Sequence, residues 1–288
     1  MPAGVFNVLK PPGMTSHDVI SYLRKITGER KTGHAGTLDP DAAGVLPVFV
    51  GAATRVLEYA EHAEKSYLAW VRFGIKTDTG DDSGEIIERC SVPDFSEIEL
   101  TAALTGLTGD IMQVPPMRSA LKINGQRLYK LARAGQTVER VARPVKINQL
   151  KILCRADDKI LLEINCSKGT YIRTLAEDLA GRLGTCATLT FLLRTRAGMF
   201  FLGDAGTLEE ISNRPEAHLL PADAVLKHLG ELRLTLDRAG RFVQGVKIAV
   251  PNNLTGNVRV YSPDGLFIGI GETDGQTLKP RKVLNNVR

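Results

Sequence analysis

Hydrophobic and polar positions recur along the chain with two different periods. Apolar residues return at helical spacing from about residue 17 to 27, and Ser16 precedes them as the predicted N-cap. Residues 65–75 instead alternate between apolar and polar side chains, which predicts a half-buried strand. Residues 45–50 are apolar almost throughout and predict a strand buried on both faces. The chain therefore combines helices with sheet from its first quarter onward.

Caps, turns and shorter apolar patterns place the remaining elements. Further helices are predicted over 54–61, 95–105 with a Ser96 cap, 128–134, 171–183, 208–218 and 221–229. Further strands are predicted over 85–89, 147–155, 159–166, 233–236, 246–250, 257–261 and 266–270, with turns at 156–158 and 262–265. Because strands and helices mix without regular βαβ alternation, we expect an α+β fold with a mixed, largely antiparallel sheet flanked by helices.

The pattern also divides the chain into two parts. Residues 1–230 carry the mixed elements, and residues 231–288 consist of short strands and turns, which predicts a small β-rich C-terminal domain. A length of 288 residues suits one large domain and one small one. A unit of about 60 residues has little core of its own, so we expect it to pack on the larger domain.

Composition and cysteine spacing narrow the class of protein. A hydrophobic content of 43% with 24% charged residues is typical of a globular chain. The apolar run 42–53 is too short to span a bilayer, and the N-terminus shows no secretory signal, so we expect a cytoplasmic protein. The cysteines show no C-x-x-C spacing, and we expect reduced, buried thiols and no zinc site; they are Cys90, Cys154, Cys166 and Cys186.

Positive charge gathers in one segment. The net charge is +5 and the pI about 9.0, which suits a polyanionic partner without identifying it. Residues 113–146 hold eight basic residues against the single acid Glu139, and a solvated surface would normally mix the signs. We therefore expect phosphate binding by this segment, whose basic residues are Arg118, Lys122, Arg127, Lys130, Arg133, Arg140, Arg143 and Lys146.

One short segment, residues 33–44, has the composition of a rigid loop around a single acid. Asp39 lies between glycines and directly before Pro40, and a residue before proline is held in extended geometry. Gly36 and Gly44 allow backbone turns and close approaches that a side chain would prevent. On spacing alone, a surface turn with a solvated aspartate explains the segment equally well.

The sequence Gly-His-Ala-Gly-Thr-Leu-Asp-Pro-Asp-Ala-Ala-Gly of this loop resembles the catalytic-loop signature of pseudouridine synthases, and of the bacterial tRNA pseudouridine-55 synthases in particular. Four more segments resemble that family in the same order; they are KPPGMTS at 10–16, KSY at 65–67, PPMRSALK at 115–122 and SKGTYIR at 167–173. The specific resemblance covers about residues 5–200. It implies the pseudouridine synthase fold for a catalytic domain over 1–230, followed by a PUA-like RNA-binding domain over 231–288.

The implied reaction breaks the bond between C1′ and N1 of a uridine and rejoins the base through C5. It transfers no electrons and imports no group, so we expect no cofactor, and the sequence has no phosphate-binding glycine motif. Asp39 can attack the sugar, attack the base or stabilise charge at the anomeric carbon, and the sequence leaves these open. A glycosidase needs two acids, but Asp41 is expected to point elsewhere and no other partner is evident.

The resemblance assigns two further catalytic residues. Arg173 would pair with Asp39, keeping the carboxylate ionised and oriented through a bidentate contact. Tyr67 would stack on the target base and help to remove the proton from C5. Without the resemblance, Arg173 is an exposed helical arginine and Tyr67 an ordinary core aromatic.

The target uridine lies inside a folded tRNA arm, so it must be flipped out before it can react. The resemblance implies that His34 fits against the displaced nucleotide, while Tyr171 and Leu192 form further walls of the base pocket. A structural histidine and a core leucine are the competing interpretations of His34 and Leu192.

The expected partner is the T-arm of tRNA, because segment 113–146 is similar to the insertion with which this family closes on that arm. Arg118 stands where the family is expected to have a tyrosine, which affects RNA contact and leaves the catalytic residues intact. We expect a monomer with no obligate protein partner and no membrane contact. An RNA-binding or RNA-folding module with secondary or lost catalysis, an accessory tRNA-folding role and a component guided by a separate RNA remain alternatives.

Overall fold

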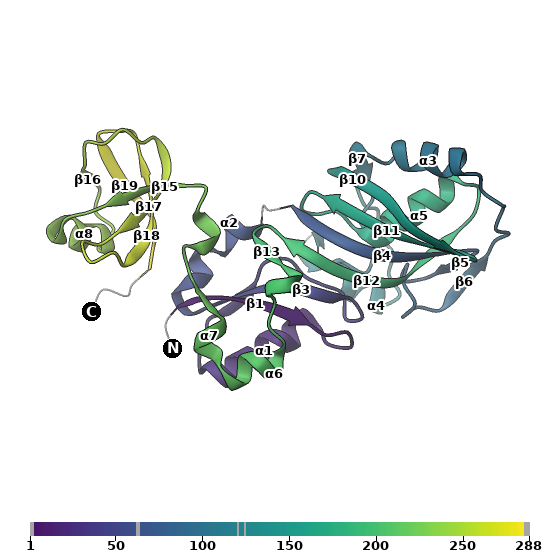
Figure 1. Ribbon diagram of the computed structural model, residues 1–288, viewed down its shortest axis with the longest axis horizontal. Coiled ribbons are helices and arrows are strands. Elements are labelled where there is room, and N and C mark those ends of the chain that lie inside the picture. Colours follow the sequence, from purple (N-terminus) through teal and green to yellow (C-terminus); the bar gives the residue numbers. More distant parts are fainter. Residues whose placement is uncertain (1–2, 62–63, 120, 124, 285–288) are drawn as a thin grey trace.

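A single twisted sheet forms the framework of the larger domain. The computed structural model describes residues 3–61, 64–119, 121–123 and 125–284, and Figure 1 shows the sheet to the right of a smaller C-terminal unit. Within the described residues, ten strands build this sheet in the spatial order β14 (Leu219–Pro221), β1 (Gly4–Lys10), β3 (Ala43–Val50), β12 (Ala187–Ala197), β4 (Lys65–Phe73), β11 (Lys159–Cys166), β10 (Arg143–Ala156) and β7 (Gly109–Gln113), with β2 (Thr32–His34) on β3 and β13 (Phe200–Phe201) on β12.

The sheet is mixed and largely antiparallel, as predicted. Only the short contact between β3 and β12 is parallel among its pairings in the described residues. This contact pairs Leu193 with Ala43 and Arg194 with Gly44. It joins the N-terminal strands, which carry the loop 33–44, to the central strands β12, β4 and β11. The loop that contains Asp39 therefore lies at the junction of two halves of the sheet.

Helices cover the sheet where their apolar faces can be buried. Helix α5 contacts β12 and β4, and α3 packs against α5 and β10, so both cover the same part of the sheet (Figure 1). Val19, Ile20 and Leu23 are the buried face of α1. The helices and 3₁₀ turns are α1 (Ser16–Thr27), η1 (Gly51–Val56), α2 (Leu57–Glu61), α3 (Glu97–Thr105), α4 (Leu128–Arg133), α5 (Ile172–Arg182), η2 (Leu202–Asp204), α6 (Leu208–Asn213), α7 (Pro215–His218), η3 (Ala224–Leu226) and α8 (Leu236–Val243).

The N-cap of α1 is Thr15, and the predicted cap Ser16 is wrong by one residue. The Thr15 hydroxyl accepts from the backbone N–H of Asp18, and the Asp18 carboxylate accepts from the backbone N–H of Thr15, which forms a capping box. Ser16 is buried instead and bonds to the backbone of Leu38 in both directions. For α3 the predicted cap Ser96 is confirmed, again as a capping box, with Glu99.

The C-terminal unit is a five-stranded sheet packed against one helix within the described residues. Its order is β15 (Gly230–Arg233), β17 (Gly256–Tyr261), β18 (Phe267–Thr273), β19 (Thr277–Val283) and β16 (Ile248–Ala249). The predicted turn at 262–265 connects β17 to β18, where Ser262 N–H donates to the Leu266 carbonyl. Ile270 and Leu284 pack into the same cluster as Val56 of the larger domain. The unit therefore rests on the larger domain, as expected from its size.

Four predictions between residues 208 and 250 are wrong in detail. The helix 208–218 is broken at Arg214, because Pro215 keeps the preceding residue out of helical geometry. Residues 221–229 form the end of edge strand β14 and a 3₁₀ turn, since β14 pairs with β1. The predicted strand 233–236 lies earlier, because β15 pairs in parallel with β17 and α8 begins at Leu236. Strand β16 is shorter than the predicted 246–250.

Two cysteines form a disulfide, which contradicts the expectation of reduced thiols. Cys90 and Cys186 lie 96 residues apart in sequence, yet their Cα atoms are 5.8 Å apart. The backbone of Gly74 brings them together, since its N–H donates to the Cys186 carbonyl and its C=O accepts from the Cys90 N–H. Cys154 is exposed, also against expectation, and Cys166 is buried and free. Only long-range pairing of the strands makes the disulfide geometry possible.

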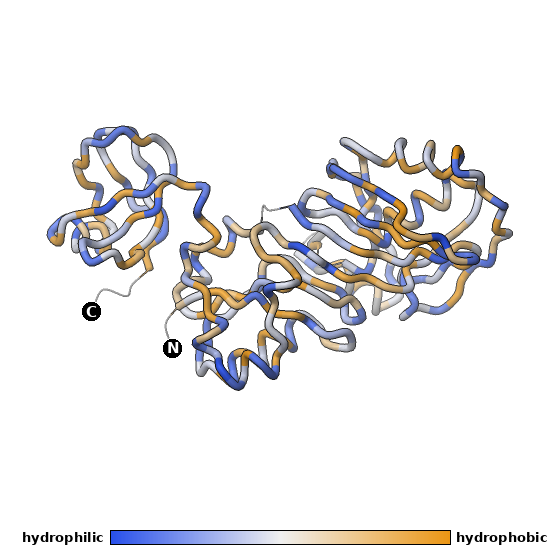
Figure 2. Tube along the Cα trace, viewed as in Figure 1, coloured by the Kyte–Doolittle hydropathy of each residue, from blue (hydrophilic) through white to orange (hydrophobic). Residues whose placement is uncertain are grey.

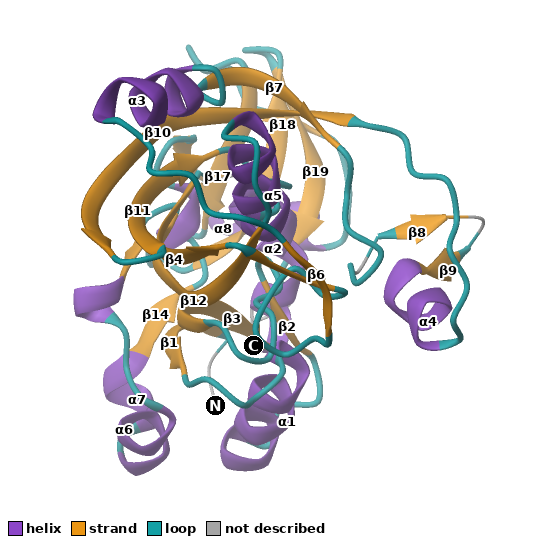
Figure 3. Cartoon of the chain, turned by 90° about the vertical axis from the view of Figure 1, so that its right-hand side faces the viewer, coloured by secondary structure: helices purple, strands orange, loops and turns teal. Residues whose placement is uncertain are grey.

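Two small hairpins stand outside the main sheet. The strands β5 (Ile75–Thr77) and β6 (Ile86–Arg89) flank a turn that reaches toward α5. The strands β8 (Lys122–Ile123) and β9 (Gln126–Arg127) precede α4, and Figure 3 shows this second hairpin with α4 set apart from the main sheet. The middle of the basic segment 113–146 thus lies beside the main sheet, while its two ends belong to the sheet strands β7 and β10.

Apolar segments are distributed over both parts of the chain. Figure 2 shows hydrophobic and hydrophilic residues interleaved along the strands of the sheet and of the C-terminal unit. Among the residues that the structure describes, no helix is both long and apolar enough to cross a membrane.

Candidate functional site

The loop between β2 and β3 presents Asp39, and two glycines set its path. Gly36 and Gly44 have φ angles of +92° and +111°, in the region that disfavours residues with a side chain. A Cβ on Gly44 would lie 2.2 Å from the backbone oxygen of Arg194, so a side chain there would displace β12 from the loop. The predicted need for glycine at both positions is therefore confirmed.

A buried lysine, Lys10, holds the loop on the C-terminal side of Asp39. Lys10 is fully buried, and its ammonium donates to the carbonyls of Pro11, Pro40 and Ala42 at 2.9, 2.8 and 2.6 Å. Burial lowers the pKa of Lys10 to about 8, partly offset by nearby Asp41 and Asp39. Lys10 lies in one of the family-like motifs, but the sequence did not identify it as a residue that holds the Asp39 loop.

Arg173, in the first turn of α5, grips the Asp39 carboxylate through both oxygens. Its Nε lies 3.0 Å from Oδ2, and its Nη2 donates to Oδ1 at 3.1 Å. The remaining donors reach the carbonyl of Thr79 at 2.7 Å and that of Arg118 at 2.9 Å. Arg173 is 5% exposed, whereas the Asp39 side chain keeps 37% of its surface open to solvent. The guanidinium thus holds one side of the carboxylate and leaves another side accessible.

Opposing effects act on the pKa of Asp39, and Arg173 does not dominate them as the sequence suggested. Loss of hydration raises the pKa of Asp39 above its ordinary value, and Arg173 opposes that rise. A second carboxylate, Asp81, adds to the rise because its charge repels a charge on Asp39. The expected effect of Arg173 is present, but the net shift of the pKa is upward.

Asp81 is a site residue that the sequence missed. It lies in the turn between β5 and β6, and its Oδ2 is 3.6 Å from the Nε of Arg173. Its other oxygen accepts from the Thr79 hydroxyl at 2.7 Å and from the Ser83 N–H at 3.1 Å. The acidic turn 77–84 could have pointed to Asp81, but no neighbouring residue in the sequence indicated that this turn would reach α5. Asp39 therefore has an acidic neighbour, contrary to expectation, and the two carboxylates share the guanidinium of Arg173.

A cavity of about 170 Å³ opens beside these groups. Asp39, Asp81 and Leu192 all line it, and the exposed ring of Phe191 borders it; the complete lining is Asp39, Asp41, Ala42, Asp81, Asp82, Ser83, Leu189, Thr190, Phe191 and Leu192. Leu192 itself is 8% exposed. The carboxylate of Asp39 thus borders a recess that is lined by further acidic side chains and by residues 189–192 of β12.

Tyr67 lies on β4, beneath the Asp39 loop. It is 7% exposed and stands directly opposite Arg194 in the pairing of β4 with β12. Burial raises the pKa of Tyr67, while the Arg194 cation works against the rise. Asp39 is among the charged groups that act on this hydroxyl. The structure therefore places Tyr67 near Asp39 and also makes it part of the core, so both sequence interpretations hold for its position.

His34 directly precedes the loop that carries Asp39, and Tyr171 directly precedes the helix that carries Arg173. His34 ends β2, and its buried Nδ1 has no hydrogen-bond partner among the described residues. Burial lowers the pKa of His34 to about 4, and the cations of Arg194 and His17 add to this effect. Tyr171 precedes α5, and the Gln113 side chain binds its backbone N–H and C=O at 3.0 and 3.3 Å. Burial raises the pKa of the Tyr171 hydroxyl, because it disfavours the charged phenolate.

Among the residues predicted to bind RNA, Arg118 and Lys130 have side chains that the structure describes. Arg118 pairs with Asp78 at 2.6 Å, and its carbonyl accepts from Arg173, so segment 113–146 contacts the site directly. The side chain of Lys130 is exposed. The side chains of Lys122, Arg127 and Arg133, together with Ala120 of the family-like motif, lie outside the described residues.

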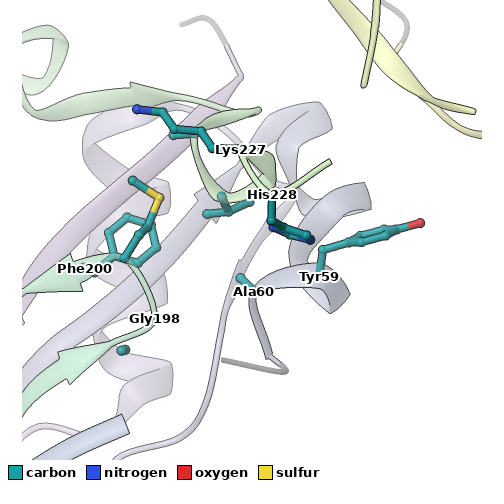
Figure 4. A pocket seen from close by; sticks show the side chains of 10 residues that line it. Tyr59, Ala60, Gly198, Phe200, Lys227 and His228 are labelled. Carbon is teal, nitrogen blue, oxygen red and sulfur yellow. The ribbon is translucent and has the colours of Figure 1, made fainter. Parts of the chain in front are cut away.

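A larger cavity of about 440 Å³ lies elsewhere in the chain (Figure 4). It is lined by Tyr59, Phe200 and His228 among others, and by none of the site residues. In the described part of the chain, no group of three or more His, Cys, Asp or Glu side chains is arranged to hold a metal ion.

Comparison with known proteins gives consistent matches. Residues 24–172 match the model of the TruB family pseudouridylate synthase N-terminal domain, and residues 230–284 match the C-terminal model of pseudouridine synthase II TruB. The chain is 46% identical to tRNA pseudouridine synthase B of Moorella thermoacetica, covering 99% of this chain and 100% of that protein. For the same enzyme of Hydrogenovibrio crunogenus the identity is 40%, with 98% and 94% covered.

A solved structure extends the likeness to the fold. The crystal structure of a Cbf5-Nop10-Gar1 complex contains a chain that matches with a TM-score of 0.75 and 26% identity, covering 98% of this chain and 84% of that one. The expected α+β fold with a β-rich C-terminal domain is thereby confirmed.

Proposed function

The chain belongs to the TruB family of pseudouridylate synthases and is a tRNA pseudouridine synthase; on that premise we propose that Asp39 is its catalytic carboxylate. The observation that carries this proposal is the bidentate contact of Arg173 with Asp39, which leaves part of the carboxylate open toward the cavity of about 170 Å³. A carboxylate fixed on one side and accessible on the other is suited to act on an inserted nucleotide.

The isomerisation requires three changes in bonding. The bond between C1′ and N1 breaks, a bond between C1′ and C5 forms, and one proton leaves C5 while one is gained at N1. Charge develops at the anomeric carbon when the first bond breaks. A negative group held beside that carbon stabilises the charge or bonds to it, and Asp39 is positioned for either role.

Arg173 orients this carboxylate. A planar guanidinium that binds both oxygens fixes the direction of the carboxylate, and the carbonyls of Thr79 and Arg118 fix the guanidinium in turn. Arg173 also opposes the rise that burial causes in the pKa of Asp39, which favours the ionised form that the reaction needs. Asp81 approaches the same guanidinium, with its Oδ2 3.6 Å from the Nε atom that also contacts Asp39.

Tyr67, Leu192, His34 and Tyr171 complete the proposed base pocket. Leu192 lines the cavity next to Asp39, and Tyr67 lies on the neighbouring strand with its hydroxyl under the influence of Asp39. We assign Tyr67 to stacking on the base and to proton transfer at C5. The buried, neutral imidazole of His34 and the partly buried ring of Tyr171 are assigned to the flipped nucleotide and its surroundings.

We place the target uridine in the T-loop, with the T-arm held by segment 113–146. The contact of Arg118 with Arg173 supports this placement, because it brings the basic segment to the edge of the catalytic site. The C-terminal domain, proposed to span 231–288, would add a further RNA-binding surface; the start of β15 at Gly230 supports that boundary. An accessory role in tRNA folding is compatible with the same contacts.

We further propose that the protein acts as a cytoplasmic monomer, because the folded tRNA that it modifies is its one required partner. Elution of the protein at the mass of a single chain, with and without tRNA, checks the monomer. A dimer that alone is active would contradict it.

Mapping the product tests the function as a whole. Unmodified tRNA is incubated with the protein, and pseudouridine is located by mass spectrometry after chemical labelling. We expect one modified position, in the T-loop, and no modification there when that uridine is replaced by cytidine. Modification confined to another arm of the tRNA would overturn the T-loop assignment, and no pseudouridine at any position would overturn the role of Asp39.

A further inference from the structure

Arg194 is a buried cation whose role the reaction as described does not explain. It is 0% exposed, and no carboxylate of the described residues forms an ion pair with it. A buried charge without a counter-ion is costly unless hydrogen bonds satisfy it. Burial accordingly lowers the pKa of Arg194. The groups that bind its guanidinium therefore indicate the role of the charge.

The guanidinium binds the backbone on both flanks of the Asp39 loop. Its Nη2 donates to the Gly36 carbonyl at 3.0 Å, and its Nη1 lies 3.4 Å from the Thr37 carbonyl, both before Asp39. Its Nε donates to the carbonyl of Val45, after Asp39, at 2.6 Å. A planar group with donors on several edges can hold both flanks in one fixed relation, which a flexible ammonium cannot reproduce.

The same guanidinium faces Tyr67. Arg194 and Tyr67 are directly opposite each other in the pairing of β12 with β4, and both side chains are buried. A guanidinium has donors only, so it presents N–H groups and positive charge to the Tyr67 oxygen. The other groups that act on these two side chains are Cys166 and Asp39 at Tyr67, and His34 and Lys10 at Arg194.

We propose that Arg194 is a positioning residue that locks the Asp39 loop and the Tyr67 ring into one arrangement and keeps the Tyr67 oxygen beside a fixed positive charge. Because Arg194 is buried and is not among the residues that line the cavity of about 170 Å³, it acts through these two residues and not on the RNA. The inference rests on the proposed roles of Asp39 and Tyr67. It assigns a function to a residue of β12 that binds the loop and lies opposite Tyr67.

Two substitutions separate the two parts of the proposal. Arg194→Lys keeps the positive charge but loses the planar fork, whereas Arg194→Gln keeps amide donors and loses the charge. Arg196→Lys is the matched control, because Arg196 lies two residues further along β12 and donates to the carbonyl of Gly198 instead. Folding of each variant is checked by circular dichroism, and tRNA affinity by filter binding.

The rate of the chemical step is measured in single turnovers at saturating enzyme. We expect Arg194→Lys to slow it by about 10- to 100-fold, the scale on which misplacement of a catalytic group by 1 Å acts, with tRNA affinity unchanged. Arg196→Lys should leave the rate at the wild-type value. A folded Arg194→Lys variant that reacts at the wild-type rate would overturn the positioning of the loop.

Tyr67 ionisation provides a readout that a merely structural role would not move. The absorbance of phenolate at 295 nm is titrated for each protein and for the same protein with Tyr67→Phe, and the difference isolates Tyr67 among the six tyrosines. Because the Arg194 cation favours the phenolate, Arg194→Gln should move the Tyr67 titration to higher pH, and Arg194→Lys should leave it near the wild-type position. No movement in Arg194→Gln overturns the link to Tyr67.

If Arg194→Gln does not fold, the Lys variant still decides the question. In the Tyr67→Phe background, Arg194→Lys should slow the chemical step less than in the wild type, because part of its effect passes through the hydroxyl. Equal slowing in both backgrounds contradicts the coupling. Wild-type rates in Asp39→Asn or Tyr67→Phe alone would instead show that the proposed function is at fault, and not the role of Arg194.

Discussion

Arg173 binds Asp39 through both carboxylate oxygens, with its Nε 3.0 Å from Oδ2 and its Nη2 3.1 Å from Oδ1. The contact joins the first turn of α5 to a loop 134 residues earlier in the chain. It fixes the direction of the one carboxylate proposed to act on the nucleotide. Asp39 therefore does not depend on its own loop alone for orientation.

Asp39→Asn should abolish isomerisation and leave tRNA binding nearly intact. The amide keeps the size of the side chain but loses its negative charge and its nucleophilicity. We expect the single-turnover rate to fall by at least about 100-fold, the scale of losing one electrostatic catalytic group. Filter binding of tRNA serves as the control. Turnover within tenfold of the wild type would remove Asp39 from the mechanism.

Arg173→Lys should slow the reaction although the charge is kept. An ammonium cannot make the planar bidentate contact, and the loss of one charge-assisted hydrogen bond, about 1.5–3 kcal/mol, corresponds to a rate lower by about 10- to 150-fold. Arg182→Lys, on the exposed last turn of the same helix, is the matched control. Equal rates for the two variants would show that the pairing is unimportant for catalysis.

Asp81→Asn should lower the rate and also shift its pH dependence. The charge of Asp81 raises the pKa of Asp39, so its neutralisation lowers that pKa and moves the acid limb of the rate profile to lower pH. The rate falls as well, because Arg173 loses its second carboxylate neighbour. Rate profiles of both proteins between pH 4 and 8 measure the shift. An acid limb that moves to higher pH would contradict the assignment of this carboxylate.

His34 should make the protein less stable in mild acid. Its pKa is about 4 in the folded chain and about 6.5 when unfolded, so the unfolded chain takes up a proton first as the pH falls from 6.5 to 4. Stability then decreases by at most about 1.4 kcal/mol for each pH unit in that window. His34→Gln should flatten the slope of chemical denaturation midpoints against pH, whereas His228→Gln, at an exposed position, should not. Identical slopes for both variants would contradict the burial of His34.

Charge reversal at Arg127, Lys130 and Arg133 together should weaken tRNA binding and flatten its salt dependence. Each phosphate contact that is lost removes about one counter-ion from the slope of log affinity against log salt. The chemical step on bound tRNA should suffer less than binding, since these residues belong to the segment beside the site. Binding isotherms at several salt concentrations, with single-turnover rates at saturating enzyme, separate the effects. An unchanged slope with a collapsed rate would place the segment inside the catalytic site.

Local signals in the sequence determined much of the fold. The helix 95–105 was predicted together with its Ser96 cap, because a capping box needs only four neighbouring residues. The turn 262–265 was visible for the same reason. The glycines of the Asp39 loop were also predictable, since a positive φ is a property of one residue. The family-like motifs added Arg173 and Tyr67, whose places beside Asp39 the sequence pattern alone does not give.

What only the tertiary structure decided involves residues that are far apart in the chain. Strands β1 and β12 were not predicted, although both border the Asp39 loop, because their apolar patterns acquire meaning only when they pair with β3. The same holds for the disulfide, because Cys90 and Cys186 come together only where the backbone of Gly74 binds both of them.

The side chains that hold the Asp39 loop also come from other parts of the chain. Lys10 and Arg194 donate to backbone carbonyls of the loop, and a carbonyl leaves no trace in the sequence. Asp81 meets Arg173 only because the turn between β5 and β6 reaches α5. The sequence by itself thus indicated Asp39 as the candidate carboxylate and the path of its loop, because these are local features. The folded chain decided which buried charges hold them, because hydrogen bonds to the backbone depend on distance in space and not on residue type.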